Sequence, residues 1–321
     1  MLDIFKEIRK DLRAVEDELQ QVVQHHHPLL NETSSHLLNA GGKRLRPAFA
    51  LLSGKFYNYQ LEKVLPLAVA LELLHMASLV HDDVVDSAAT RRGIPTVKAK
   101  WGNRISMHTG DLIFAKALVL ISKYEDTPLI TKVLSQISVK MCEGEIQQLS
   151  SAYQINQSIK DYLYRVQRKT ALLIAASCQL GAVACGAPKE IYMPLRRYGH
   201  KIGIAFQIID DILDMVADQQ KLGKTLGADL RQGIITLPML YALKNSPRKE
   251  RLAQLISKES KTEEEVFEAI DIIKECGSIE YSNLVVDRYI SGAKKELDLL
   301  PDVQAKNTLL VIADFVKHRK F

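Results

Sequence analysis

Apolar residues recur along most of the chain at spacings of three and four, the spacing that brings side chains to one face of an α-helix. The first such run consists of Phe5, Ile8, Leu12, Val15, Leu19 and Val22. Comparable runs predict further helices over about residues 44–56, 65–86, 105–122, 129–150, 159–185, 190–218, 236–245, 262–275, 278–297 and 302–318. No segment alternates apolar and polar residues between hairpin turns, as a half-buried strand would. The sequence therefore predicts an all-α fold.

Nothing in the sequence divides this helical pattern into separate parts. No linker rich in Ser, Gly or Pro interrupts the 321 residues, of which 47% are apolar. We therefore expect a single large helical domain over residues 1–321. Local signals mark some helix ends, because Thr262 and Glu265 form a capping-box pattern and Gly277 is suited to end the helix that follows them.

Composition excludes several functions. The formal net charge is only +5 and both signs are mixed along the chain, so we expect no binding to nucleic acid. The four cysteines form no CxxC pair, and the chain starts with a charged, amphipathic segment, so we expect reduced thiols and a cytoplasmic location. The His25–His27 run is expected to be a solvated helix end or loop, since adjacent residues on a helix point in different directions.

Two acidic motifs of the form DDxxD stand out from this background. They consist of Asp82, Asp83 and Asp86, and of Asp210, Asp211 and Asp214. On a helix, the first and last aspartates of each motif lie on one face, where like charges repel. Each motif also ends an apolar run, and carboxylates in such a place are costly unless cations neutralise them.

Magnesium is the cation that this pattern favours, because it takes oxygen ligands and commonly bridges a few carboxylates to substrate phosphates. A solvated acidic helix face would explain one motif but not two in apolar surroundings. A calcium loop is disfavoured, since neither motif has the glycine turn and distal Glu of an EF-hand.

Basic residues occur around both motifs. Residues 41–47 read GGKRLRP, Arg91 and Arg92 follow the first motif, and Lys169 opens an apolar helix. Arginine offers a planar fork that matches phosphate oxygens, and glycine permits close backbone approach. Each segment alone is common; their placement around the acidic motifs predicts a diphosphate site.

These motifs resemble those of the trans-isoprenyl diphosphate synthases, a family that includes farnesyl, geranylgeranyl and longer-chain enzymes. The resemblance runs in order through GGKRLRP (41–47), HMASLVHDDVVD (75–86), RRGIPTV (91–97), GDLIFAKAL (110–118), RKTALL (168–173), GIAFQIIDDILD (203–214), GKTLGADL (223–230) and TLP (236–238). It implies a helical bundle around a central cavity in which the two acidic motifs face each other.

The resemblance also implies roles for individual residues. Two or three Mg²⁺ ions would be held mainly by Asp82, Asp86 and Asp210, with Asp83, Asp211 and Asp214 in support. Isopentenyl diphosphate would be bound by Lys43, Arg46, His75 and Arg92. The allylic diphosphate would be bound by Arg91, Lys169, Thr170, Gln207 and Lys224. One departure from the family is Ile234, where a lysine is usual; Arg231 is near enough in sequence to replace it.

The first motif also predicts product length. In this family the growing chain runs beside the helix of that motif, and short-chain enzymes tend to place bulk one turn before it. Here those positions are Ala77 and Ser78, with Leu74 one turn deeper. We therefore expect a product of C30 or longer, C35 above others, for a quinone side chain; a short-chain synthase is the alternative.

Other classes fit the sequence less well. A terpene cyclase normally carries a different second metal motif, and squalene or phytoene synthases space their acidic residues differently. A non-catalytic helical partner should have degraded motifs, and both are intact. The resemblance further implies a homodimer, or a heterodimer with a small regulatory subunit, and a lipid product that brings the protein near a membrane surface.

Overall fold

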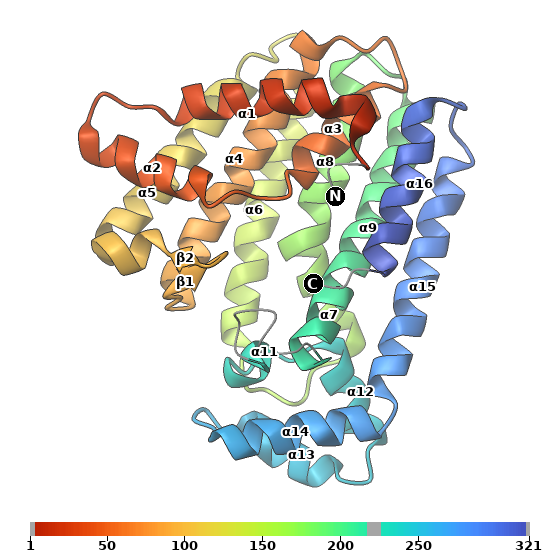
Figure 1. Cartoon of the computed structure of the whole chain (residues 1–321). Helices are drawn as coiled ribbons and strands as arrows, with labels where there is room; N and C mark the ends of the chain where they lie inside the picture. Colours follow the sequence, from red (N-terminus) through yellow and green to blue (C-terminus); the bar gives the residue numbers. More distant parts are fainter. Residues whose placement is uncertain (1–3, 217–225, 319–321) are drawn as a thin grey trace. The chain divides into compact units, whose positions relative to one another are not determined.

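The computed structural model describes residues 4–216 and 226–318, and the described chain is almost entirely helical (Figure 1). This confirms the predicted all-α class. The described residues fall into two compact units. Unit 1 comprises residues 1–134, 176–196 and 300–309, and unit 2 comprises residues 135–175, 197–299 and 310–321. The single domain expected over residues 1–321 stays a prediction.

Unit 1 is organised around one long buried helix. Its helices include α1 (Arg9–Val23), α2 (Pro28–Asn39), α3 (Leu45–Gly54), α4 (Leu61–Val85) and α5 (Val97–Ile121), preceded by the short η1 (Lys6–Ile8). Helix α4 contacts α1, α3 and α5, and α2 lies against α5. Because α4 is covered on several sides, its residues from Val64 to Leu74 are almost all buried.

Helix α4 is the described helix long and apolar enough to cross a bilayer. However, 67% of its most apolar window is buried inside the protein. We therefore interpret α4 as a core helix of unit 1. The acidic residues at the C-terminal end of α4 therefore lie at the edge of this core.

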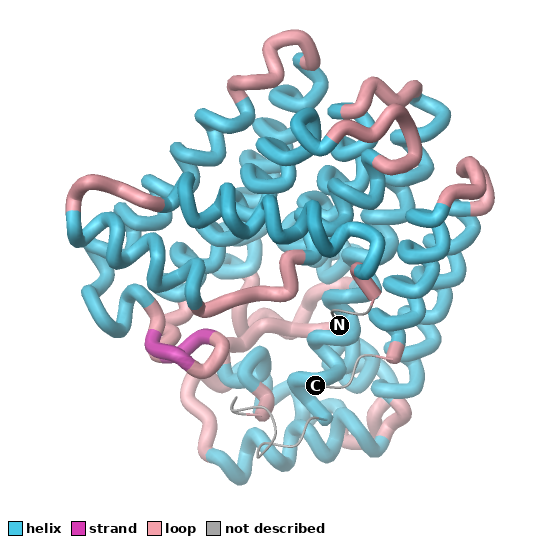
Figure 2. The backbone as a smooth tube through the Cα atoms, turned by 45° about the horizontal axis from the view of Figure 1, so that its top comes forward, coloured by secondary structure: helices cyan, strands magenta, loops and turns pink. Residues whose placement is uncertain are grey.

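A two-stranded hairpin follows α4, shown in magenta in Figure 2. Strand β1 (Thr90–Arg91) pairs antiparallel with β2 (Ile94–Pro95), and Arg91 lies opposite Ile94. The two loop residues, Arg92 and Gly93, both have positive φ, at 54° and 81°. These values match the type I′ turn that joins twisted strands through two residues.

Unit 2 contains the shorter helices of the C-terminal half. They include α7 (Ile159–Val166), α11 (Ala228–Arg231), α12 (Leu237–Asn245), α13 (Lys249–Ser257), α14 (Glu263–Glu275) and α15 (Ser278–Leu297). Helix α12 contacts α7, α13, α14 and α15, so it is central to this unit. Residues of both units belong to α6 (Pro128–Ser150), α8 (Leu172–Ala184), α9 (Lys189–Val216) and α16 (Gln304–Lys317).

Several local predictions are confirmed. Thr262 and Glu265 form a reciprocal capping box at the start of α14. Gly277 has φ of 77°, a left-handed conformation that glycine adopts without steric cost, and it separates α14 from α15. The predicted helix over 159–185 is interrupted by a π-helical segment, η2 (Gln167–Ala171).

Four elements were not predicted: α2, α11, α13 and the hairpin. Helix α2 is rich in polar residues, and its Pro28 occupies the first helical turn, where the missing N–H costs nothing. Helix α13 spans only nine residues, too few for a clear periodic signal. The hairpin strands have two residues each, so no alternation exists to detect.

Candidate active site

The first acidic motif lies at the C-terminal end of α4 in unit 1. Asp82 is half-buried, Asp83 is buried and Asp86 is exposed at the helix C-cap. The backbone N–H of Asp86 donates to the carbonyl of Asp82 over 2.8 Å, so the two residues lie on successive turns. The role of Asp82 and Asp86 as a metal-facing pair stays a prediction.

Asp83 has a different environment from its neighbours. Its Oδ1 accepts from Nε of Arg91 and lies 2.7 Å from both Nε and Nη2, and the residue is only 2% exposed. Burial raises the pKa of Asp83 above its ordinary value, and the charge of Arg91 acts in the opposite direction. Asp83 therefore anchors the hairpin to α4. Arg91 stays a predicted contact of the allylic diphosphate, with its guanidinium held by Asp83.

The GGKRLRP segment supplies cations at the start of α3. Arg44 occupies the N-cap of this helix in a left-handed conformation, and its guanidinium is directed to Glu16 and Glu72. Arg46, in the first turn, is half-buried, and its Nε has no hydrogen-bond partner among the described residues. Burial lowers the pKa of Arg46 to about 10, so the guanidinium stays charged at neutral pH. A helix N-terminus with such a cation favours an anion.

His75 lies on α4, seven residues before Asp82, near the arginines of unit 1. Burial, followed by the charges of Arg46 and Arg92, lowers the pKa of His75 well below its usual value. The imidazole is therefore neutral at neutral pH and can donate one N–H to a phosphate oxygen. Lys43, the fourth predicted contact of isopentenyl diphosphate, is exposed in the preceding loop.

The three predicted chain-length residues also lie on α4. Ala77 is 1% exposed and Leu74 is 5% exposed, whereas Ser78 is half-buried. The Ser78 hydroxyl donates to the carbonyl of His75 over 2.8 Å, a bond back to the previous turn. Their role in product length stays a prediction.

The second acidic motif lies on α9 in unit 2. Asp211 is 3% exposed and accepts two hydrogen bonds, from the Tyr162 hydroxyl at 2.6 Å and from Nε2 of Gln207 at 2.9 Å. Burial raises the pKa of Asp211 to about 6, against the lowering effect of these bonds. Asp211 is therefore held from within the unit, while Asp210 is only half-buried.

Asp214 organises the segment that follows α9. Its carboxylate accepts from the backbone N–H groups of Ala228 and Asp229, at 3.0 and 3.1 Å. Burial, and then the charges of Asp214 and Asp211, raise the pKa of Asp229 well above its ordinary value. Several carboxylates thus crowd one region of unit 2, which creates a demand for cations.

The π-helical segment η2 carries the predicted basic residues of unit 2. Nζ of Lys169 lies 3.1 Å from Oε2 of Glu145, and the Thr170 hydroxyl donates to Oε1 of Gln207 over 2.7 Å. Two predicted contacts of the allylic diphosphate, Thr170 and Gln207, are thereby joined to each other and to Asp211. π-Helical turns occur often at functional sites, because they shift the direction of side chains.

Helix α9 approaches this segment closely at the start of the second motif. A Cβ on Gly203 would lie 2.5 Å from Cα of Ala171, so only glycine fits here. The contact holds Thr170 next to Gln207, and it explains the small residue at the start of GIAFQIIDDILD.

Two more basic residues, Lys224 and Arg231, are candidates for contact with the allylic diphosphate. Lys224 lies outside the described residues. Arg231 pairs with Glu263 over 2.7 Å and donates to the carbonyl of Leu226, so it is committed to α14. The structure therefore does not support Arg231 as the replacement for the lysine that is usual at position 234.

Three residues of this site were not predicted. Tyr162 holds Asp211, and Arg165 donates to the carbonyl of Ile235 and to Oε1 of Gln157 at 3.0 Å. Glu72 is a buried acid on α4. The sequence contained a signal only for Glu72, which is the single carboxylate in an otherwise apolar run. Tyr162 and Arg165 could not be predicted, because they pair with residues distant in sequence.

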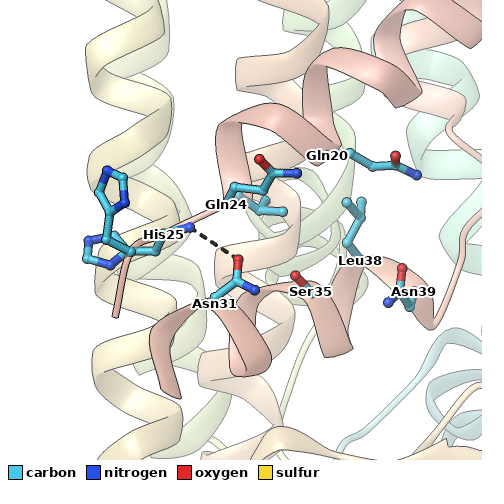
Figure 3. A pocket seen from close by; sticks show the side chains of 9 residues that line it. Gln20, Gln24, His25, Asn31, Ser35, Leu38 and Asn39 are labelled. Carbon is cyan, nitrogen blue, oxygen red and sulfur yellow. Dashed lines mark hydrogen bonds between the residues drawn. The ribbon is translucent and has the colours of Figure 1, made fainter. Parts of the chain in front are cut away.

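A cleft of about 690 Å³ lies beside α1 and α2 in unit 1 (Figure 3). Its lining consists of Gln20, Val23, Gln24, His25, His26, Asn31, Ser35, Leu38 and Asn39. The His25 backbone N–H donates to Oδ1 of Asn31 over 3.2 Å, within an exposed loop. The lining has neither carboxylates nor basic Lys or Arg, so it suits no diphosphate. The expected solvated helix end or loop at His25–His27 is confirmed, since these residues form an exposed loop between α1 and α2.

An all-helical chain with two acidic motifs, each among its own basic residues, defines the class of enzymes that transfer prenyl groups from diphosphates. Residues 27–273 match the family model described as polyprenyl synthetase. Heptaprenyl diphosphate synthase component 2 of Bacillus subtilis is 48% identical over 98% of this chain and 89% of its own length. Geranylgeranyl diphosphate synthase of Methanosarcina mazei is 36% identical over 100% of this chain and 98% of its own length.

A solved structure gives the same result. Polyprenyl synthase from Caulobacter crescentus, complexed with calcium and isoprenyl diphosphate, aligns with a TM-score of 0.94 and 32% identity, over 99% of this chain and 98% of that one. The chain therefore belongs to the polyprenyl synthetase family, and it is a prenyltransferase.

Proposed function

We propose that this chain lengthens an allylic prenyl diphosphate, such as farnesyl diphosphate, with isopentenyl diphosphate units to about C35. It would act as the large, catalytic component of a heptaprenyl diphosphate synthase. The observation that carries the proposal is the group of Arg46, Arg92 and neutral His75 in unit 1, close in sequence to an intact acidic motif. A relative at 48% identity with that activity in its name supports the product, whereas a geranylgeranyl synthase is more distant at 36%.

Unit 1 residues would bind isopentenyl diphosphate directly. Arg46 presents a buried Nε without a partner, and His75 supplies a neutral donor. Guanidinium groups bind phosphate oxygens in a bidentate manner, and these bonds are stronger than neutral ones. Direct binding through fixed side chains needs no metal.

The allylic diphosphate would be bound by unit 2 residues together with divalent ions. The proposed ligands are Asp82 and Asp86 of unit 1 and Asp210 of unit 2, whose carboxylate oxygens lie at or near the surface and are of the type that Mg²⁺ prefers. When bound, the ions would stabilise negative charge on the departing diphosphate. Lys169 would add a cation, and Thr170 and Gln207 would orient the diphosphate through hydrogen bonds.

These residues account for the reaction in outline. The allylic carbon–oxygen bond breaks, and Lys169 helps to stabilise the charge that develops on the diphosphate. The double bond of isopentenyl diphosphate then attacks the allylic cation, and a new carbon–carbon bond forms. The proton that is lost passes to an acceptor such as the released diphosphate. Apolar residues of α4 keep water from the cation.

Further features follow from the relatives by analogy. The name "component 2" supports a partner subunit, and we propose a small regulatory one, or a second copy of this chain. We propose a cytoplasmic enzyme whose lipid product, a precursor of a menaquinone side chain, passes to a membrane.

The test is a condensation assay. Purified chain is incubated with Mg²⁺, labelled isopentenyl diphosphate and farnesyl diphosphate, with and without the small subunit of a related enzyme. We expect products that end near C35 when the complete enzyme is present. A complete absence of condensation under both conditions, or products that end at C20, would contradict the proposal.

A further inference from the structure

The buried carboxylate of Glu72 lies among the cations of unit 1. Glu72 is on α4, one turn before His75, and only 2% of its surface is exposed. Its Oε1 lies 3.3 Å from Nη1 of Arg44. Its Oε2 is buried and has no hydrogen-bond partner among the described residues. A buried carboxylate oxygen without a donor is costly, so this position calls for a compensating role.

Three guanidinium groups interact electrostatically with the carboxylate of Glu72. Its negative charge stabilises the charged forms of Arg44, Arg46 and Arg92. Arg92, in turn, disfavours the charged form of Arg46, as expected for like charges in proximity. Glu72 is therefore the shared countercharge of a cluster whose members otherwise repel one another.

Gly42 shows how closely two of these groups approach. A Cβ at Gly42 would lie 2.8 Å from Nη1 of Arg44 and 2.9 Å from Nη1 of Arg92. The hairpin turn and the segment before α3 thus bring the guanidinium groups of Arg92 and Arg44 close to the backbone of Gly42, which has no side chain. Without a negative charge nearby, this arrangement is electrostatically unfavourable.

We infer that Glu72 is a positioning residue, which holds Arg44, Arg46 and Arg92 together so that the site is formed before the diphosphate of isopentenyl diphosphate arrives. The inference rests on the proposed function of this cluster. In this view, folding already overcomes the repulsion between the three guanidinium groups. Binding of the diphosphate then does not have to supply this free energy.

A purely structural ion pair with Arg44 makes a different prediction. If Glu72 only added negative charge near the site, its removal would leave binding of the anion unchanged or strengthen it, and if it only paired with Arg44, its removal would have the same effect as removal of Glu16, the other partner of Arg44. If Glu72 positions the arginines, its removal weakens binding. The sign of the effect, together with the comparison with Glu16, therefore separates these interpretations.

The experiment compares Glu72→Gln with wild type in steady-state kinetics. Glutamine keeps the size of the side chain but removes its charge. We expect the KM for isopentenyl diphosphate to rise about ten-fold, the scale on which loss of the partner of a binding group weakens a site. The KM for farnesyl diphosphate and kcat should change less than about two-fold. An unchanged or lower KM for isopentenyl diphosphate would overturn the inference.

A matched control exists in Glu16→Gln. Glu16 binds the same Arg44 through both carboxylate oxygens, at 2.8 and 2.9 Å, but its side chain is 37% exposed. The groups that shift the pKa of Arg46 and Arg92 among the described residues include Glu72, whereas Glu16 acts on Arg44. The control should therefore leave the KM for isopentenyl diphosphate within about two-fold of wild type. An increase equal to that of Glu72→Gln would overturn the inference, since loss of Arg44 pairing alone would then explain both.

Two further variants complete the design. Glu72→Asp keeps the charge and serves if Glu72→Gln does not fold; we expect the same KM to rise by less than about three-fold, and a rise of about ten-fold or more would overturn the inference. Arg46→Ala tests the proposed function separately. If Arg46→Ala leaves the KM for isopentenyl diphosphate unchanged, the site assignment fails; if it raises this KM while Glu72→Gln does not, only the positioning role fails.

Discussion

Asp211 provides a pH-dependent test of how the second acidic motif is held. The residue is 3% exposed, and burial raises its pKa from 3.8 to about 6. Between these values the folded protein keeps a proton that the unfolded chain has lost. The contribution of this group to stability is therefore complete below about pH 4 and is lost as pH rises through about 6. At 1.36 kcal/mol per pH unit, the loss is about 3 kcal/mol.

Replacement by asparagine removes this dependence. Asp211→Asn cannot ionise, and its amide oxygen still accepts from the Tyr162 hydroxyl. In the absence of divalent ions, we expect the variant and wild type to be similar in stability near pH 4.5. At pH 7.5 the variant should be more stable by about 2 kcal/mol, because about 1 kcal/mol of the total loss has already occurred at pH 4.5.

The assay is urea unfolding followed by circular dichroism, in a chelator, at both pH values. Titrating groups that do not interact with Asp211 occur in both proteins, so their effects cancel in the difference between variant and wild type. The reasoning is refuted if this difference is the same at pH 4.5 and pH 7.5 within about 0.5 kcal/mol.

Five further substitutions probe the proposed reaction. Asp82→Ala or Asp210→Ala should lower turnover by several orders of magnitude with an unchanged circular dichroism spectrum; near-normal turnover with Mg²⁺ would contradict the two-motif mechanism. Arg46→Ala should raise the KM for isopentenyl diphosphate by the equivalent of about 2–3 kcal/mol, and Lys169→Ala should mainly affect the allylic substrate; the reverse pattern would refute the assignment. Ala77→Phe should shorten the product to roughly C15–C20, because a ring fills space on α4; an active variant with unchanged products would remove the basis of the length prediction.

The helices could be predicted where apolar spacing was long and regular. Helix α4 is such a case, because its run of buried residues ends at a recognisable acidic motif. Helix α13 and the hairpin could not be predicted, since short elements depend on tertiary contacts rather than on local pattern. The hairpin matters for the proposed function, because its turn directs Arg92 toward Gly42.

Individual roles within a motif were harder to predict than the motif itself. Asp82 and Asp83 are the same residue type, and only the fold shows that Asp83 turns inward to Arg91. Arg231 has the right charge and sequence position to replace a lysine, but Glu263 of α14 takes its guanidinium. Such pairings join residues far apart in the sequence, so no local pattern reveals them.

The central claim is that the two substrates are held by different chemistry: isopentenyl diphosphate by cations of unit 1 directly, and the allylic diphosphate with divalent ions. Calorimetric titration of each substrate, or of an unreactive allylic analogue, with and without Mg²⁺ tests this claim directly. We predict that removal of Mg²⁺ changes the Kd of isopentenyl diphosphate by less than about three-fold, and weakens binding of the allylic analogue by about 100-fold or more. Equal dependence of both ligands on Mg²⁺ would contradict the account.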